Sequence, residues 1–520
     1  MQKKLISLLA LLLAMAVGVP SAMAFSKDSL VLQKCTMCHG VENGRIARVQ
    51  DIRTTPEEWR VIVNRMARLH GMDLKPGEMH TLLKELCATQ SLSPDEAKEV
   101  AYLDLHNNPQ TMEKPLPNDP KKLFVTCVRC HSAGKIHSYR MTASAWSKLR
   151  DFHLYMYPTV VYQMRDMRWI PEADSVLRQL AKSQPYGRDW KTPTASPAGS
   201  WVIVGHEPGK GDYLGHASIR KGEKGDYTVT GSLDFANGKQ EGFHGRATLY
   251  GGYALRTHLD DDGFTVKGAY SFDRGTLHGE RSFAAPNYQT AYSTWYRQSE
   301  KAKVLRVSPS FVLSGETTTL RLEGMNLPSV HASNLKINGG SVKVLSAKRL
   351  NRNLVEAQVV YLGNGLKHAK VSLQGLHAGS LVLAPQIDYI AVTPQTGRAR
   401  LYGGKKFPAE GVQYEAIAYS NGADALNPAD DVELGPVRAT FHLSEDVTRP
   451  GDDDLRWLGK IEPDGTYLPV GTYEPIPARN YHAEGTGMVY VNADYQRDGH
   501  QYHAKAKLVV TDPDFITRIR

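Results

Sequence analysis

The stretch LQKCTMCHG, residues 32–40, holds two cysteines three positions apart, with a histidine directly after the second. The same arrangement recurs as TCVRCHS at residues 126–132. A thiol pair with this spacing can bind zinc, act as a redox dithiol, or attach haem covalently. The choice among these three decides which fold and chemistry to expect of the N-terminal region.

The surroundings of the two CxxCH motifs favour covalent haem. A zinc site built from two CxxC pairs normally has them about 15–20 residues apart, and these pairs are much further apart. A thioredoxin-like dithiol lies in a βαβ context, whereas both motifs here precede helical patterns. We therefore predict two covalent haem c groups. The attaching cysteines and proximal iron ligands are Cys35, Cys38 and His39 for one haem, and Cys127, Cys130 and His131 for the other.

Several helix-start signals occur within residues 25–190. TPEEWRVIVNRMARL, from Thr55, opens with a threonine, a proline and two glutamates, which are typical of a helix N-terminus. SPDEAKEVAYLDL, from Ser93, and IPEADSVLRQLAKS, from Ile170, open in a similar way. An α-helical, cytochrome c-like dihaem domain is the expected fold of this region.

An internal repeat divides this domain into two tandem haem units, at about residues 25–110 and 111–190. Each copy has a CxxCH motif, then an arginine and a threonine six and four positions before a tryptophan, then a proline-initiated helix. The repeated residues are Arg53, Thr55 and Trp59 in the first copy, and Arg140, Thr142 and Trp146 in the second.

The repeat also indicates candidate sixth iron ligands. Seven positions after the tryptophan, the first copy has Met66 and the second has His153. Positions seven apart lie on one helix face, and Met and His are usual axial ligands. We expect His/Met ligation, with the higher potential, in the first unit and His/His ligation in the second. Other candidates stay open: His70 and Met72 in the first unit, and His137, Met141 and Met156 in the second.

Cys87 is the cysteine outside the two motifs. It lies in TLLKELCATQ, an apolar helical pattern, so we expect a buried and inert thiol. A crosslink or a redox sensor is the alternative. All five cysteines lie in the first quarter of the chain, so the remainder must fold without disulfides.

Residues 1–24 have the pattern of a secretory signal peptide. Lys3 and Lys4 precede an apolar run, and AMA at residues 22–24 gives a small-residue cleavage site before Phe25. No other segment is apolar and long enough to cross a bilayer. We expect export to the periplasm and no membrane span in the mature chain.

The charge of the chain argues against nucleic-acid binding. The formal net charge is +9, to which Lys3 and Lys4 contribute, and no dense Lys/Arg block interleaved with aromatics is present. A basic face could instead help an acidic protein partner to dock.

The pattern changes after SQPYGRDWKTPTASPAG, residues 183–199, which reads as a linker. From there, apolar and polar residues alternate between Gly, Asn and Asp turns, which predicts antiparallel β structure. We expect three β-sandwich or β-barrel domains, at 191–300, 301–384 and 385–520. The fold class is therefore multidomain, α followed by all-β.

Polar clusters in the β region do not form a recognisable catalytic motif. DDDG at 260–263 and GDDD at 451–454 are expected to be turns, since neither matches a calcium loop. Scattered histidines, for which surface positions are the default expectation, are His206, His216, His244, His258 and His278.

Taken together, a signal peptide, two CxxCH units and three β domains in this order resemble the alpha subunit family of quinohemoprotein amine dehydrogenase. Two of the telling stretches are LQKCTMCHG and TPEEWRVIVNRMARLHG. VSPSFVLSGETTTLRLEGMNL looks like an immunoglobulin-like module, and PQIDYIAVTPQTGRARLYGGKKFPAEGVQYEAIAYSNG is similar to the fourth domain. The resemblance spans essentially the whole mature chain.

The resemblance implies an electron-transfer subunit within a heterotrimer. In that family, a β-propeller subunit and a small crosslinked subunit accompany the alpha chain. The small subunit carries cysteine tryptophylquinone, which oxidises primary amines to aldehydes and ammonia. The alpha subunit passes the electrons through its two haems to a soluble copper protein or cytochrome. No residue of this chain is then expected to be catalytic in amine oxidation.

Two other functions are compatible with the same motifs. One is a free-standing exported dihaem cytochrome whose β modules bind an envelope partner. The other is a dihaem peroxidase-type enzyme, which needs one haem with an open or displaceable site.

Overall fold

The computed structural model describes residues 25–105, 113–187, 192–194, 196–261, 263–283, 290–404, 409–448, 451, 453–469 and 485–511. The expected signal peptide lies outside these ranges. The chain divides into two compact units, and each is described by itself. The first unit takes the described residues of 25–100 and 115–193, and the second takes the described residues of 101–114 and 194–511.

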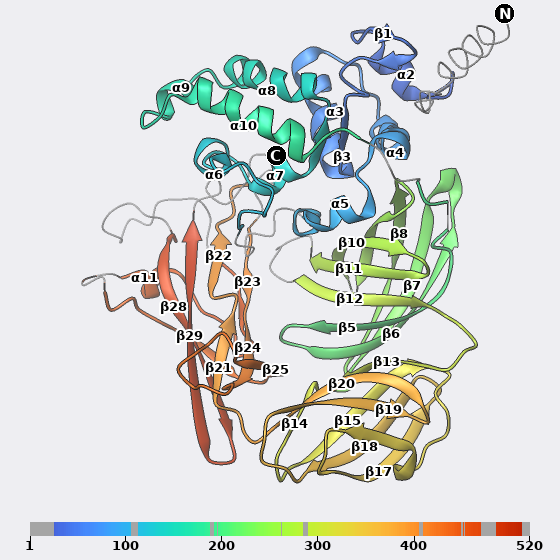
Figure 1. The fold of residues 1–520 in the computed structure, drawn as a ribbon, viewed down its shortest axis with the longest axis vertical. Helices are drawn as coiled ribbons and strands as arrows, with labels where there is room; N and C mark the ends of the chain where they lie inside the picture. The colour runs from blue at the N-terminus through green and yellow to red at the C-terminus, as the bar shows by residue number, and fades with distance from the viewer. Residues whose placement is uncertain are drawn as a thin grey trace, which may run out of the picture. The chain divides into compact units, whose positions relative to one another are not determined.

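The first unit is built from short helices and two small β ribbons (Figure 1). Its helices are α2 (Leu30–Cys35), α3 (Pro56–His70), α4 (Glu78–Gln90), α5 (Pro94–Lys98), α6 (Leu123–Thr126), α7 (Ala133–His137), α8 (Ala143–Met156), α9 (Val160–Gln163) and α10 (Trp169–Ser183). Its strands are β1 (Val41–Glu42), β2 (Arg45–Ile46), β3 (Ile52–Thr54) and β4 (Tyr139–Met141). Helices α8 and α10 run side by side.

The longer helices begin close to where the sequence signals place them. Thr55 caps α3 by accepting a hydrogen bond from the Glu58 amide, and Thr142 caps α8 in the same way from the Ala145 amide. The helix predicted from Ser93 is shorter than its pattern, since α5 ends at Lys98. The reason is that the chain passes from the first unit to the second at residues 100–101.

A two-stranded ribbon joins the two repeats. Strands β3 and β4 pair antiparallel, and Arg53 of the first copy lies directly opposite Arg140 of the second. Glu96 accepts two hydrogen bonds from the Arg53 guanidinium, at 2.8 and 2.9 Å, and its Oε1 lies 3.2 Å from Arg140 Nε. One carboxylate therefore pairs with both equivalent arginines and weakens the repulsion between them in a buried ribbon.

The second unit begins its β structure with a closed eight-stranded antiparallel barrel in the order β10-β11-β12-β5-β6-β7-β8-β9. The strands are β5 (Gly199–Glu207), β6 (Gly211–Lys221), β7 (Tyr227–Phe235), β8 (Gln240–Tyr250), β9 (Ala254–Asp261), β10 (Phe264–Asp273), β11 (Thr276–Phe283) and β12 (Thr290–Arg297). A 3-10 turn, η2 (Glu223–Gly225), separates β6 from β7. Inward positions are filled by large apolar and aromatic residues, including Trp201, Tyr213 and Trp295.

The next domain is a pair of four-stranded sheets, β13-β15-β18-β17 and β14-β20-β19-β16. Its strands are β13 (Lys303–Ser308), β14 (Phe311–Leu313), β15 (Thr317–Met325), β16 (Leu335–Asn338), β17 (Val342–Asn351), β18 (Leu354–Tyr361), β19 (Lys367–Leu373) and β20 (Leu376–Ala384). A short 3-10 turn, η3 (Ala332–Asn334), precedes β16. One apolar core, with Leu320, Val355 and Val371 among its members, draws on both sheets.

The last domain has a three-stranded sheet, β21-β24-β25, and a four-stranded one, β22-β29-β28-β26. The elements are β21 (Tyr389–Thr393), β22 (Thr396–Arg400), β23 (Val412–Gln413), β24 (Glu415–Ser420), β25 (Val432–Val437), β26 (Thr440–Ser444), α11 (Asp454–Trp457), β27 (Thr466–Tyr467), β28 (Gly487–Arg497) and β29 (His500–Thr511). The prediction of β-barrel and β-sandwich domains after the linker is confirmed.

Residues 101–114 cross into the second unit, where η1 (Ala101–Leu103) is followed by Asp104. The Asp104 carboxylate pairs with Arg256 of the barrel at 2.8 Å. Among the described residues, no helix combines the length and the apolar character that a bilayer crossing requires.

Candidate haem sites

Both CxxCH motifs lie at helix C-termini, in tight turns that bring the cysteines and the histidine close together. Cys35 is the last residue of α2, and its carbonyl accepts hydrogen bonds from the Cys38 and His39 amides at 3.2 and 2.9 Å. Cys127 follows α6, and its carbonyl lies 3.4 Å from the Cys130 amide. The first cysteine of each pair is partly covered and the second is exposed.

The first thiol of each pair lies in surroundings that favour its protonated form. Burial, with a smaller contribution from the Glu85 charge, raises the pKa of Cys35 to about 11. Burial, with a smaller contribution from Cys130, raises the pKa of Cys127 to about 12.

The second site brings the rings of His131 and His153 close together. Their ring centroids are 6.3 Å apart, with 39° between the ring planes. Two imidazole nitrogens that bind one metal from opposite sides lie about 4 Å apart, because a metal–nitrogen bond is about 2 Å long. Each ring centroid lies about 1 Å behind its nitrogen, so centroids about 6 Å apart are what two such ligands require. The separation of the two rings therefore suits a pair of imidazole ligands.

The other ring nitrogen of each histidine is already engaged. Nδ1 of His153 lies 2.7 Å from the Leu149 carbonyl, and Nδ1 of His131 lies 3.1 Å from the Ser132 carbonyl. A carbonyl accepts only from a protonated Nδ1, which leaves Nε2 as the unprotonated, metal-binding nitrogen. Burial favours the neutral form of both rings. It is the main reason why the pKa of His131 is lowered to about 4, and it is also the main reason why the pKa of His153 is lowered.

The other candidates in the second unit are placed differently. His137 is buried and its Nε2 lies 2.8 Å from Asp119, so a carboxylate already occupies it. Met141 is a buried member of β4 and packs in the core with Trp146. Met156 is the last residue of α8. His153 is thus the candidate whose ring the structure places opposite His131.

The first site is less fully specified by its geometry. Met66 lies in α3, and its carbonyl accepts hydrogen bonds from the Gly71 and Met72 amides, which terminate that helix. His70, the last residue of α3, is near enough to His39 to affect it electrostatically. Burial lowers the pKa of His39, and the charges of Arg48 and His70 lower it further. Met66 lies one turn before His70 on the same helix.

Large side chains are exposed near both motifs. Met37, between the first pair of cysteines, is 76 % exposed, and Tyr155, two positions after His153, is also 76 % exposed. The ring centroid of Trp169 lies 6.0 Å from that of His153, and its indole donates to the Thr126 carbonyl, next to Cys127. Trp169 therefore connects the second motif with His153.

Cys87 is fully buried in α4, as its apolar pattern predicts. Of the aspartate runs, Asp260 accepts from the Gly263 amide in a turn. Asp261 differs, because its side chain points into the barrel and pairs with Arg281 at 2.6 Å.

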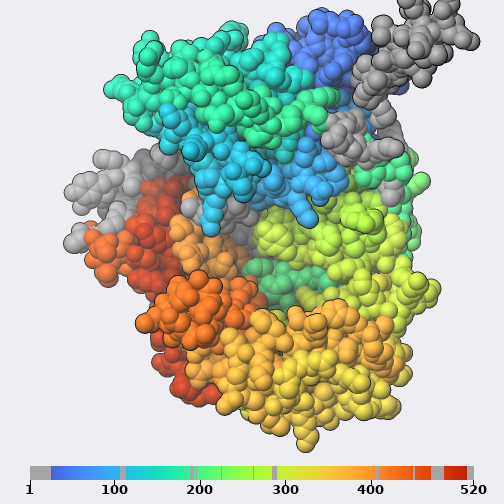
Figure 2. Space-filling model, in the orientation of Figure 1, coloured from blue at the N-terminus to red at the C-terminus, as the bar shows by residue number. Residues whose placement is uncertain are grey.

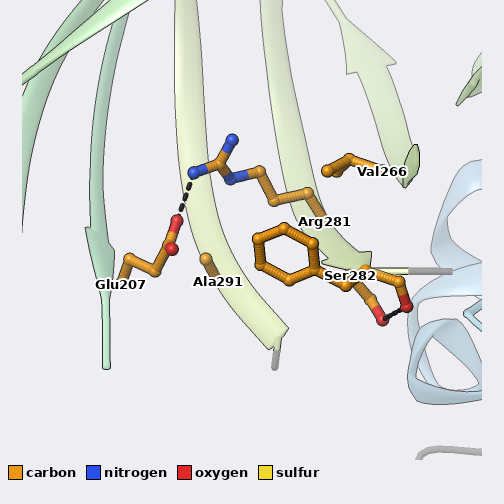
Figure 3. A pocket seen from close by; sticks show the side chains of 6 residues that line it. Glu207, Val266, Arg281, Ser282 and Ala291 are labelled. Atoms are coloured by element: carbon orange, nitrogen blue, oxygen red, sulfur yellow. Dashed lines mark hydrogen bonds and ion pairs between the residues drawn. The ribbon is translucent and has the colours of Figure 1, made fainter. Parts of the chain in front are cut away.

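The sequence reasoning missed a buried charge network at one end of the barrel. The pocket in Figure 3 is lined by Glu207, Val266, Arg281, Ser282, Phe283 and Ala291. Arg281 pairs with Glu207 and Asp261, and Lys210 bridges Glu207 and Glu241 at 2.7 and 2.8 Å. The signal was present in β11, where Arg281 occupies the same alternating phase as Leu277.

The expectation that His206 lies free on the surface was wrong. Its Nδ1 lies 2.8 Å from Asp212 and its Nε2 lies 2.6 Å from Glu415 of the last domain. Burial alone lowers the pKa of His206, but the hydrogen bonds and charges of the two carboxylates outweigh it and raise that pKa to about 9. A long-range partner such as Glu415 has no signature in the local sequence around a histidine.

Two solved structures illustrate the likeness of parts of the chain to known proteins. A redesigned β barrel, mFAP1, bound to DFHBI, is 12% identical over 19% of this chain and 94% of that chain, with a TM-score of 0.18. The Bacteroides ovatus protein SGBP-B, in complex with a mixed-linkage heptasaccharide, is 12% identical over 47% of this chain and 55% of its own, with a TM-score of 0.19. TM-scores of this size do not establish a shared fold. No curated protein matches the chain.

Three segments of the chain match family models that describe one and the same kind of protein. Residues 25–190 match the family described as quinohemoprotein amine dehydrogenase A, alpha subunit, haem binding. Residues 195–291 match domain II of the same alpha subunit, and residues 390–518 match its domain IV. The resemblance inferred from the motifs is confirmed: the chain belongs to the quinohemoprotein amine dehydrogenase alpha-subunit family.

Proposed function

We propose that this chain is the periplasmic dihaem c electron-transfer subunit of an amine dehydrogenase. Family membership supports haem binding and a place in a multi-subunit oxidoreductase. The finer proposal is that the chain takes electrons from a quinone on a partner subunit and passes them to a soluble copper protein or cytochrome. Cysteine tryptophylquinone and the amine-oxidising residues belong to the small partner subunit, and a β-propeller subunit completes a heterotrimer.

The observation that carries the proposal is the pairing of His131 with His153. Their spacing of 6.3 Å and their engaged Nδ1 atoms suit two axial ligands on one iron. Two such ligands would leave no open position on the second haem, which favours electron transfer at that haem. Haem held in this way supplies reversible one-electron transfer.

The chain's own residues would hold and shield the cofactors. Cys35 and Cys38 would attach the first haem, and Cys127 and Cys130 the second. The Leu149 carbonyl fixes the ring of His153. Trp169 covers that ring and keeps water from it, which lowers the local dielectric and makes nearby charges effective at the iron.

The test is a haem count combined with spectroscopy on the purified protein. Pyridine haemochrome analysis should give two haem c per chain, and electron paramagnetic resonance should show two low-spin haems that cyanide and carbon monoxide leave unchanged. One haem, or a high-spin haem that binds cyanide, would contradict the proposal.

Purification of the native protein separates the subunit from a free-standing cytochrome. We expect two further chains to copurify, and amine addition to reduce both haems in the complex. A monomer that carries out its full electron transfer alone would favour a free-standing exported cytochrome whose β modules bind an envelope partner.

The sixth ligand of the first haem has its own test. We propose Met66, and His70, four positions later in the same helix, is its competitor. The wild type should show the long-wavelength Met–iron absorption band, Met66→Ala should abolish it, and His70→Ala should keep it. A wild type without this band, whose low-spin first haem becomes high-spin in His70→Ala, would assign His70, and a band that survives both changes would direct attention to Met72.

A further inference from the structure

Helix α3 belongs to the first repeat, yet one of its faces contacts residues of the second repeat. Glu58, Ile62 and Arg65 have the spacing that places side chains along one face. Ile62 packs against the core cluster of the second repeat, which contains Trp146. The Arg65 guanidinium lies 4.8 Å from the ring centroid of Phe152, the residue before His153.

Glu58 makes a buried ion pair with the second repeat. Its Oε2 accepts hydrogen bonds from the Tyr139 hydroxyl at 2.7 Å and from Lys135 Nζ at 3.3 Å. The side chains of Glu58 and Lys135 are 3 % and 16 % exposed. Charges so well covered are screened only weakly by solvent and salt, so they act at longer range than surface charges.

The two charges lie beside the helix that follows the second motif. Lys135 is in α7, four positions after the proposed ligand His131, and its contact with Glu58 holds that carboxylate next to the same helix. Tyr139, which also donates to Glu58, follows α7 in strand β4. An iron held by His131 would experience the fields of both charges.

We propose that Glu58 and Lys135 set the midpoint potential of the second haem by opposite charges. The inference rests on the proposed ligation by His131 and His153. An oxidised haem carries one more positive charge than a reduced one, so the Glu58 carboxylate favours the oxidised form and lowers the potential. The Lys135 ammonium favours the reduced form and raises it. The first repeat thereby tunes the potential of the haem attached to the second.

The experiment is a spectroelectrochemical titration of the whole purified complex. The second haem accepts one electron from dithionite and returns one to ferricyanide, and the first haem serves as internal reference. Glu58→Gln should raise the potential of the second haem, and Lys135→Met should lower it. At a fixed solution potential we expect a several-fold to tenfold change in the oxidised-to-reduced ratio, where tenfold corresponds to 59 mV for one electron.

Two matched variants control for disturbed packing. Tyr139→Phe removes a hydrogen bond to Glu58 without changing any charge, and Glu57→Gln removes the same charge from the neighbouring position of α3. Both control variants should change the midpoint potential of the second haem by only a small fraction of the shifts expected for Glu58→Gln and Lys135→Met. Should Glu58→Gln fail to fold, Lys135→Met alone still decides the question by the sign of its shift.

Shifts of the same sign for Glu58→Gln and Lys135→Met, or none for either, would overturn the inference. Failure of the proposed function is distinguishable, because it removes the starting spectrum. A wild-type second haem that lacks a low-spin bis-histidine signature refutes the ligation itself. A normal signature with unmoved potentials refutes only the tuning by Glu58 and Lys135.

Discussion

The proposed ligand His153 shows how much a side chain's suitability for binding a metal depends on its other hydrogen-bond partners. Its Nδ1 is 2.7 Å from the Leu149 carbonyl one helical turn earlier, and this contact fixes both the tautomer and the ring orientation. His137 illustrates the opposite case, since Asp119 occupies its Nε2. Two histidines of one repeat thus differ in availability through their hydrogen-bond partners.

This difference predicts how the second haem responds to substitution. His153→Ala should convert that haem from low-spin to high-spin, because one axial position loses its nitrogen, and added imidazole should restore the low-spin form. Absorption and electron paramagnetic resonance spectra measure both states. His137→Gln is the control and should keep the low-spin spectrum. A low-spin second haem in His153→Ala without imidazole would assign the ligand elsewhere.

At the scale of helices and strands, the repeat is visible in equivalent hydrogen bonds. The Trp59 indole donates to the Gln90 carbonyl at 2.9 Å, and the Trp146 indole donates to the Gln184 carbonyl at 3.1 Å. Each bond ties the helix that carries the candidate ligand to the end of a later helix. The tryptophans therefore help to hold each candidate ligand helix against a later helix of its own repeat.

Removing either bond should cost similar amounts. Trp59→Phe and Trp146→Phe each remove one hydrogen bond to a buried carbonyl and lose some packing, so the free energy of unfolding should fall by about 1–3 kcal/mol. Denaturant unfolding followed by the haem absorption of the complex measures this. Trp457→Phe is the control, because Trp457 lies in the other unit, is partly exposed and donates to Asp453. A loss for only one of the two repeat tryptophans would contradict their equivalence.

Local patterns predicted those elements whose signals are local. Thr55 and Thr142 indicate helix starts, and the alternation of apolar and polar residues predicts the strands of the barrel. The sequence could not indicate that Glu58 meets Lys135, or that Arg281 meets Glu207, because such pairs depend on which segments the fold brings together. The shorter helix after Ser93 has the same origin, since the transition between units overrides its helical pattern.

At the scale of the whole second unit, a chain of polar contacts links its three β domains. Arg306 of the sandwich donates to the barrel carbonyls of Gly205 and Tyr213 and pairs with Glu323 at 2.6 Å. The surfaces of the barrel, green to yellow-green, and the sandwich, yellow to amber, adjoin in Figure 2. His206 extends the chain to Glu415 of the last domain. The domains are therefore coupled through charged groups as well as through apolar packing.

The coupling through His206 should make stability depend on pH in a defined direction. The groups facing His206 are Asp212 and Glu415, and Arg306 lies 3.4 Å from Asp212. The pKa of His206 is raised to about 9, above about 6.5 for an unfolded histidine. Its stabilisation is therefore complete below about pH 6.5 and is lost as the pH rises through about 9, with a total on the order of 2 kcal/mol.

The measurement is denaturant unfolding of the complex between pH 6 and 10 for the wild type and His206→Gln. The wild type should be the more stable protein at pH 6, and the difference should shrink as the pH approaches 9, because only the wild type loses a proton from this junction. His503→Gln removes an exposed histidine that pairs with Asp494, and its difference from the wild type should not follow this curve. A pH-independent difference for His206→Gln would mean that the ring contributes packing without charge, and that the junction between barrel and last domain does not depend on a histidinium.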